Sequence, residues 1–189
     1  LITDMNQPLG RKVGNAVETA EAIEALAGVI DGDFGELCLD LSAHMLIVAG
    51  VQSDVTAARR QALEAIHSGR ALECFGRVIE AQGGDPRVLE DLSLLPHANR
   101  ELVVNSAHRG WVTGIETDEL GRIVMEWGGG RSRLGEPIDL GVGLAIEAKI
   151  GSRVERGEPL VRAFFNDESR RDEMKQRLEG AFHIGDAAP

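Results

Sequence analysis

Residues 144–165, LAIEAKIGSRVERGEPLVRAFF, decide the fold class. Two short apolar runs, 144–150 and 160–165, flank a polar segment that contains Gly151 and Gly157. Short β-prone runs bounded by glycine, proline and polar residues are typical of paired strands. This stretch therefore predicts two strands joined by a turn, and the similar runs at 102–104 and 111–113 predict further short strands.

The residues before Pro96 show helical periodicity almost throughout. Apolar side chains at steps of three and four predict four helices, with approximate ranges 16–30, 37–48, 54–66 and 71–79. Asn15 and Glu18 have the spacing of a capping box at the start of the first helix. The turn cluster at 31–33 is expected to end that helix.

Two more helices are expected in the second half, one over 117–127 and a last one marked by Met174, Leu178 and Phe182. The fold class is therefore α+β, with a helical module followed by a short-stranded β module. The β module resembles a barrel-sandwich hybrid with flanking helices. We predict two domains, residues 1–98 and residues 99–189.

Composition excludes several classes of function. The 189 residues are 43% apolar and carry a formal net charge of −11, which repels a phosphate backbone and argues against general nucleic-acid binding. Apolar runs stay shorter than the ~20 residues that cross a bilayer. Cys38 and Cys74 make no disulfide framework and are expected to be buried thiols, and no Cys/His spacing resembles a zinc site. We expect a cytoplasmic protein with no membrane partner.

The run TDMNQPLG at 3–10, followed by Gly14, has features of a ligand-binding loop. Leu1 and Ile2 indicate the end of a β-strand, and loops that leave such ends often bind ligands. Gly10 and Gly14 allow the backbone to turn several carbonyls toward one point, where a carboxylate would complete a site for a hard cation. The alternative is an ordinary connection between a strand and a helix, in which polar side chains only satisfy the backbone of the turn.

Three runs of the sequence together resemble the pyrimidine-nucleoside phosphorylases, of which thymidine phosphorylase is the nearest type. These runs are LITDMNQPLGRKVGNAVETAEAIEAL at 1–26, ALECFGRVIEAQGGDP at 71–86 and GWVTGIETDELGRIVMEWGGGRSRLGEPIDLGVG at 110–143. They keep the family's order across essentially the whole chain and correspond to the C-terminal part of such enzymes. We therefore expect the chain to be a piece of a longer protein.

The resemblance implies a reaction in which phosphate cleaves thymidine to thymine and 2-deoxyribose 1-phosphate. The partners of the intact enzyme would be a pyrimidine nucleoside and phosphate, and the enzyme would be a cytoplasmic homodimer. Residues 1–98 would be the helical part of its α/β phosphate-binding domain, and 99–189 its C-terminal α+β domain. The family's Lys-His-Ser-Thr-Gly-Gly phosphate loop is not found in the 189 residues. We therefore assign no catalytic residue and expect the chain to be inactive by itself.

The resemblance also implies a cation site. The chemistry requires no cofactor, but potassium-binding family members use two backbone carbonyls and a glutamate that correspond to Leu9, Lys12 and Glu21. The alternative for Glu21 is a solvated helix face, because Glu18 and Glu24 follow the same three-residue step. The family's other cation ligands lie in the phosphate loop, so the affinity of these three alone is expected to be weak.

Two further segments are candidates for function. In the glycine-rich stretch 128–137, Arg131 and Arg133 would belong to a mobile flap that meets an anion, or else to a wide connection with solvated arginines. The turn at 151–157 resembles the hairpins of biotinyl and lipoyl carrier modules. Lys149 is expected inside the preceding strand, however, so this likeness implies no site for a prosthetic group.

Two alternatives to the enzyme interpretation stay open. One is a stand-alone, non-catalytic binding module of the same architecture, and the other is a related nucleoside-monophosphate phosphorylase. We also expect apolar surface to be exposed around Leu1, Ile2 and the first helices, and the chain to self-associate through it.

Overall fold

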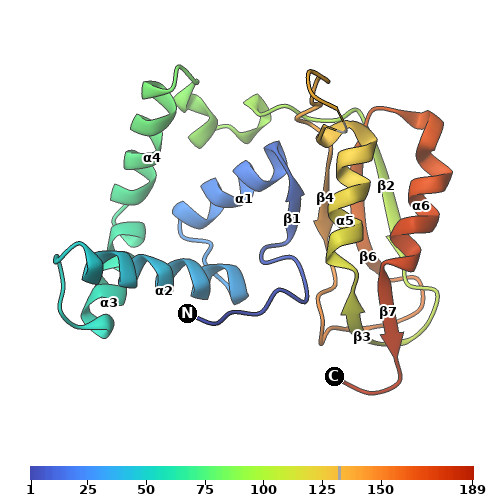
Figure 1. The fold of residues 1–189 in the computed structure, drawn as a ribbon, viewed down its shortest axis with the longest axis horizontal. Coiled ribbons are helices and arrows are strands. Elements are labelled where there is room, and N and C mark those ends of the chain that lie inside the picture. The colour runs from blue at the N-terminus through green and yellow to red at the C-terminus, as the bar shows by residue number, and fades with distance from the viewer. Residues whose placement is uncertain (132) are drawn as a thin grey trace. The chain divides into compact units, whose positions relative to one another are not determined.

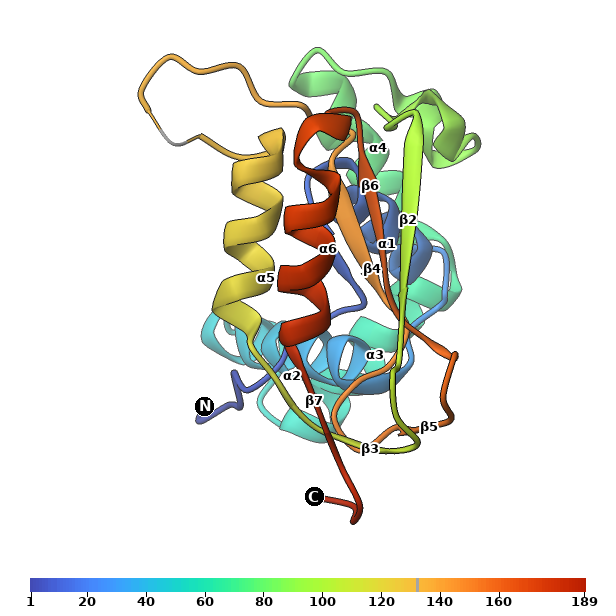
Figure 2. The ribbon, with the colours of Figure 1, turned by 90° about the vertical axis from the view of Figure 1, so that its right-hand side faces the viewer.

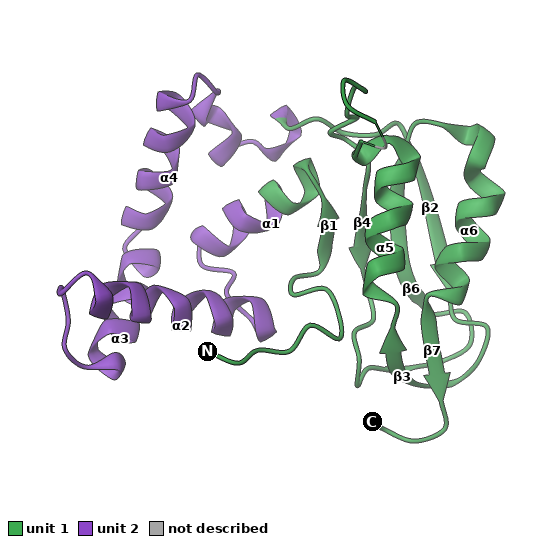
Figure 3. Cartoon of the chain, viewed as in Figure 1, with its two compact units in different colours: residues 1–19, 95–189 green, residues 20–94 purple. Residues whose placement is uncertain are grey.

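The computed structural model describes residues 1–131 and 133–189, which divide into two compact units. Unit 1 comprises residues 1–19 and 95–189, and unit 2 comprises residues 20–94 (Figures 1 and 3). The α+β fold class is confirmed, since the described residues form helices and two antiparallel sheets without a closed barrel. The predicted domains, 1–98 and 99–189, stay a prediction.

Unit 1 is built on two antiparallel sheets (Figure 2). The four-stranded sheet has the order β1 (Lys12–Gly14), β4 (Gly143–Ile146), β6 (Pro159–Phe165) and β2 (Arg100–Asn105). The three-stranded sheet has the order β5 (Arg153–Val154), β3 (Gly110–Ile115) and β7 (Phe182–Gly185). All four residues of β4 are buried, and so are Leu160, Val161, Ala163 and Phe165 of β6, which explains why both sequences are mostly apolar.

Two helices complete unit 1. These are α5 (Thr117–Val124), which continues into a π-turn at Met125–Gly129, and α6 (Arg171–Gly180), which follows a short 3-10 turn at Glu168–Arg170. They stand side by side in Figures 1 and 2. Apolar side chains from both helices and both sheets form one core, whose largest fully buried members include Phe165, Leu120, Ile123, Leu144, Ile146, Met174 and Leu178.

Unit 2 is entirely helical in its regular structure. It contains most of α1 (Ala16–Leu26), then α2 (Gly32–Val48), α3 (Val55–His67) and α4 (Arg70–Ala81), followed by 3-10 turns at Pro86–Leu89 and Leu92–Leu94. Helix α3 packs against both α2 and α4. Among the described residues, no helix has the length and apolar character needed to cross a membrane.

The first helix differs from its prediction at both ends. Asn15 does not accept a capping hydrogen bond; its Nδ2 donates to the carbonyl oxygen of Gly129 at 2.8 Å, while Glu18 Oε1 accepts from the amide of Gly14. The helix ends at Leu26 rather than near residue 30, because Gly28 adopts φ +111° and its amide bonds back to the last turn. Residues 31–33 begin α2 instead of ending the first helix.

Three strand assignments also need correction. Residues 1 and 2 form no strand; the strand of this region is β1, which pairs with β4 as the edge of the four-stranded sheet. Strand β4 ends at Ile146 rather than 150. Phe182 is not helical: α6 ends at Gly180, and Phe182 pairs opposite Ile115 in β7. Phe182 is buried, as its apolar spacing suggested, but it is buried as part of a sheet rather than of a helix.

Candidate functional site

The run QPLGRKVG at residues 7–14, here called the PLG segment, lies along residues 143–150 of the same unit. The Lys149 ammonium donates to the carbonyl oxygen of Leu9 at 2.8 Å, and the amide of Ile150 donates to Gln7 Oε1 at 2.9 Å. The amide of Ile146 donates to the carbonyl oxygen of Arg11 at 2.6 Å. These bonds join segments about 140 residues apart, so the loop conformation depends on the β module.

The Arg11 side chain reinforces this attachment. Its guanidinium donates to the carbonyl oxygens of Glu147, at 3.1 Å, and Ile146, at 3.3 Å. Hydrogen bonds from a charged donor contribute more than neutral ones. Arg11 therefore stabilises the turn after β4 at the same place where that turn holds the PLG segment.

A close backbone approach positions the end of the PLG segment. Gly14 has φ +144° and pairs with Gly143 across the β1–β4 ladder. A Cβ atom at Gly14 would lie 2.7 Å from the carbonyl oxygen of Val142 and 2.9 Å from the Cα of Gly143. Only glycine fits such an approach without moving a strand. The path from β1 into α1 is therefore fixed by the absence of a side chain.

The predicted cation ligands fall in both units. Leu9 and Lys12 belong to unit 1, whereas Glu21 lies on the part of α1 that belongs to unit 2. Leu9 is 41% exposed, and its carbonyl oxygen is the acceptor of the Lys149 ammonium. That oxygen therefore faces a positive charge in this structure. The assignment of Leu9, Lys12 and Glu21 to a cation site stays a prediction.

The π-turn at the end of α5 fixes one end of the glycine-rich stretch. Trp127 stacks on Phe165 with ring centroids 4.2 Å apart, and its Nε1 donates to the carbonyl oxygen of Asp167 at 2.9 Å. The carbonyl of Gly128 accepts from the amide of Asp139 at 2.8 Å. The π-turn was not predicted from the sequence, in which its one signal is a tryptophan directly before three glycines.

A network of ion pairs joins the π-turn to α6. Glu126 accepts hydrogen bonds from Arg177, at 2.9 Å, and from Arg170, at 3.0 Å, and Arg177 also pairs with Glu119 at 2.6 Å. Hydrogen bonds from Arg177 and Arg170 lower the pKa of Glu126 below its usual range. The side chains in the network are only about one quarter to one third exposed. Their pairing therefore fixes the packing of α5 on α6.

The other end of the glycine-rich stretch is also anchored. Asp139 accepts from the amide of Gly141 at 3.0 Å and from Asn166 Nδ2 at 2.7 Å. Between the anchors, the amide of Arg133 donates to Glu136 Oε2 at 3.0 Å, and Arg131 is exposed. Ser132, within the predicted flap, lies outside the described residues. The mobility of this flap stays a prediction.

The predicted position of Lys149 inside a strand is wrong. Strand β4 ends three residues earlier, and Lys149 lies in the turn that follows. Two hydrogen bonds close this turn. The amide of Lys149 donates to Ser152 Oγ, and the amide of Ser152 donates to the carbonyl oxygen of Lys149. The lysine is thus directed at the PLG segment.

The prediction that both cysteines are buried is also wrong, since Cys38 and Cys74 are exposed. Each lies on a helix, α2 for Cys38 and α4 for Cys74, on a side that the described residues leave uncovered. Cys38 is at the edge of an apolar groove, and partial burial there raises the pKa of its thiol.

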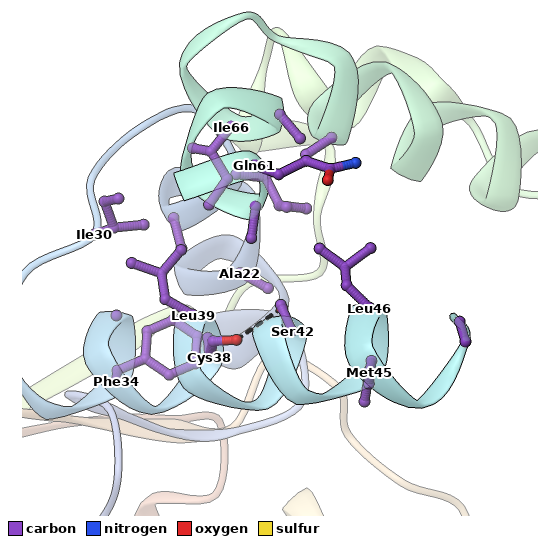
Figure 4. Close-up of a pocket in the computed structure, with 17 residues that line it drawn as sticks. Ala22, Ile30, Phe34, Cys38, Leu39, Ser42, Met45, Leu46, Gln61 and Ile66 are labelled. Carbon is purple, nitrogen blue, oxygen red and sulfur yellow. Dashed lines mark hydrogen bonds between the residues drawn. The ribbon is translucent and has the colours of Figure 1, made fainter. Parts of the chain in front are cut away.

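The apolar groove lies entirely within unit 2 (Figure 4). Its volume is about 640 Å³. The few polar groups near it are paired: Ser42 Oγ donates to the carbonyl oxygen of Cys38 at 2.7 Å, and Gln61 Oε1 accepts from Gln52 at 2.6 Å. The apolar lining includes Ala22, Leu26, Ile30, Phe34, Leu39, Met45, Leu46, Ala62 and Ile66.

Large apolar side chains of the first helices and of the start of the chain are exposed, as predicted. On α2 these are Leu41, Met45 and Val48, and Leu1 and Ile2 are exposed at the start of the chain. Exposed apolar patches of this kind commonly mark interaction surfaces.

Comparison with known proteins shows similarity to one enzyme family. Residues 111–185, from β3 to β7, match the family model described as the pyrimidine nucleoside phosphorylase C-terminal domain. The pyrimidine-nucleoside phosphorylase of Geobacillus stearothermophilus is 41% identical over 178 residues, which cover 94% of this chain and 41% of that protein. The one from Staphylococcus aureus (strain USA300) is 39% identical over 186 residues, 98% of this chain and 43% of that protein.

The chain thus spans about two fifths of the length of the curated relatives that it matches. The matched region includes the PLG segment, both sheets and the helices of unit 2. On these matches, the chain corresponds to the C-terminal portion of the pyrimidine-nucleoside phosphorylase family.

Proposed function

We propose that this chain is the C-terminal part of a pyrimidine-nucleoside phosphorylase that converts thymidine and phosphate to thymine and 2-deoxyribose 1-phosphate. The observation that carries the proposal is the identity of about 40% to such enzymes over nearly the whole chain. Such a reaction needs groups that bind the phosphate dianion and stabilise negative charge on the departing base. The family's phosphate-loop motif is not among the 189 residues, so we assign these tasks to other parts of the enzyme.

In this proposal, the chain supports the active site rather than performing the chemistry. Unit 1 positions the PLG segment through the bonds of Lys149, Arg11 and Gln7, and so sets the direction of its carbonyl groups. The full-length enzyme would be a cytoplasmic homodimer with a pyrimidine nucleoside and phosphate as its ligands.

We also propose that Leu9, Lys12 and Glu21 contribute to a potassium site in the full-length enzyme. The donors are two backbone carbonyls and a carboxylate, which are hard oxygen ligands suited to an alkali ion. The carbonyl of Leu9 accepts a hydrogen bond from the Lys149 ammonium, so a potassium ion would have to compete with that lysine. A potassium ion would supply fixed positive charge near the entry to α1, without taking part in bond making.

A non-catalytic binding module is the second candidate, and the apolar groove of unit 2 favours it. The two candidates differ in what the complete natural protein does with thymidine. A phosphorylase would release thymine only when phosphate is present, whereas a binding module would release none.

The test compares the 189-residue chain with the complete natural protein that contains it. Both are incubated with thymidine, with and without phosphate, and thymine is quantified by chromatography. We expect phosphate-dependent release by the complete protein and none by the 189 residues. Turnover by the 189 residues alone would refute the supporting role, and no turnover by the complete protein would refute the phosphorylase assignment.

A further inference from the structure

The Lys149 ammonium occupies the carbonyl oxygen that the proposed cation site would use. Its Nζ lies 2.8 Å from the oxygen of Leu9, a normal distance for a charged hydrogen bond. The lysine comes from the turn after β4, about 140 residues later in the chain, so this contact depends on the tertiary fold. A positive charge attached to the protein is therefore placed where a free cation would be expected.

The neighbouring bonds make this placement specific. The amide of Ile150 donates to Gln7 Oε1 and the amide of Ile146 donates to the carbonyl of Arg11. Lys149 lies between these two bonds in sequence, just as Leu9 lies between Gln7 and Arg11. Its ammonium therefore contacts the middle of the segment, between the attachments at the Gln7 side chain and the Arg11 carbonyl.

Electrostatics limits how this oxygen can be shared. Two unit charges at one carbonyl lie only a few ångströms apart, and even in water-like surroundings their repulsion disfavours joint occupancy by about fivefold. An ammonium group and an alkali ion therefore compete for the oxygen of Leu9. Removing the lysine charge should open that oxygen to a free ion.

We propose that Lys149 is a positioning residue that acts as a tethered cation: it fixes the Leu9 carbonyl, holds residues 7–11 against 146–150, and competes with potassium for that oxygen. The identity of the competing ion rests on the proposed function, whereas the tether itself does not. The regulatory consequence is that the lysine lowers the dependence of the PLG segment on the potassium concentration.

The test measures amide hydrogen exchange at Ile146 and Ile150, whose bonds to the PLG segment report its attachment. It uses the full 189-residue chain and the variants K149M and K149R, each in potassium chloride and in tetramethylammonium chloride at equal ionic strength. The matched control is K175M, which removes the same charge from α6, where Lys175 pairs with Glu179.

In tetramethylammonium chloride, we expect K149M to exchange about tenfold faster at these amides, because a charge-assisted bond is lost. Because the ligands in this chain alone are expected to bind weakly, only saturating potassium should restore protection in K149M. It should change wild type, K149R and K175M by less than about twofold, below the loss expected for one such bond. If the two amides of K149M exchanged at the wild-type rate, the tether would be refuted. Faster exchange that potassium does not restore would refute the competition. Neither result depends on phosphorolysis, which is measured separately.

Discussion

Substitution of Gly14 by alanine tests the close backbone approach at the PLG segment. The new Cβ would lie 2.7 Å from the carbonyl oxygen of Val142 and 2.9 Å from the Cα of Gly143. Both neighbours are backbone atoms of or next to β4, so neither can rotate away as a side chain would. Strand β1 must move off the sheet, or β4 must shift.

The magnitude follows from two contributions. Alanine at positive φ costs about 1–2 kcal/mol. Loss of the β1–β4 ladder removes the few backbone hydrogen bonds of a three-residue strand, each with a net contribution of about 1 kcal/mol. We therefore expect the free energy of unfolding of G14A to fall by about 3–5 kcal/mol.

Gly157→Ala is the matched control, because Gly157 also has positive φ but its Cβ would meet no atom within 4 Å. It should lose only about 1–2 kcal/mol. Both glycines belong to unit 1, and so do the two tryptophans, Trp111 and Trp127, so urea titrations followed by tryptophan fluorescence report on the correct unit. Equal losses in G14A and G157A would show that the approach at Gly14 contributes nothing.

Three further variants test other features. Trp127→Phe should lower the free energy of unfolding by about 1–2 kcal/mol in urea, because the buried bond to the carbonyl of Asp167 is lost while the ring stack remains; no loss would contradict that bond. Ion pairing depresses the pKa of Glu126, so its contribution is complete above about pH 4.5 and declines as the pH falls through the depressed value. The stability gap between wild type and E126Q, followed by thermal melts across pH, should therefore shrink below pH 4.5, and a constant gap would refute the ion pairs. Met45→Glu in the groove should reduce self-association in sedimentation velocity experiments. Val29→Glu is the control, because Val29 is similarly exposed but lies outside the groove, and it should not reduce self-association. Equal effects of the two substitutions would show that the groove is not the surface through which the chain self-associates.

Local sequence signals predicted most of the regular structure. Asp54 caps α3 through its side chain, with the carboxylate accepting from the amide of Ala57 at 2.7 Å, and Gly69 ends that helix region as expected. The apolar runs at 102–104 and 160–165 became β2 and β6. Their buried members are Leu102 and Val104 in β2, and Leu160, Val161, Ala163 and Phe165 in β6.

The errors arose where long-range contacts decide the outcome. Lys12–Gly14 has no periodic pattern and becomes a strand only because the edge of β4 is available to it. Phe182 has helical spacing from Leu178, and nothing local distinguishes a fourth helical turn from a strand that starts after Gly180. In both cases the tertiary fold overrides local preference.

The candidate site also combines features that the sequence indicated with contacts that only the tertiary fold creates. The family resemblance located Leu9, Lys12 and Glu21, and the glycines around the PLG segment indicated an unusual backbone path. The bond from Lys149 to Leu9 had no sequence signal, because it joins residues that are neighbours only after the sheet has formed. The same is true of the π-turn, whose shape depends on Trp127 packing on Phe165.

The pairing of Lys12 with Ala145 has a consequence for how the molecule forms during synthesis. Strand β1 leaves the ribosome before its partner, which follows more than 130 residues later. Closing so large a loop costs entropy before any contact compensates, and topologies rich in such contacts fold slowly. The edge of the sheet should therefore assemble late, and until β1 pairs, the free edge of β4 is open to pairing with other chains.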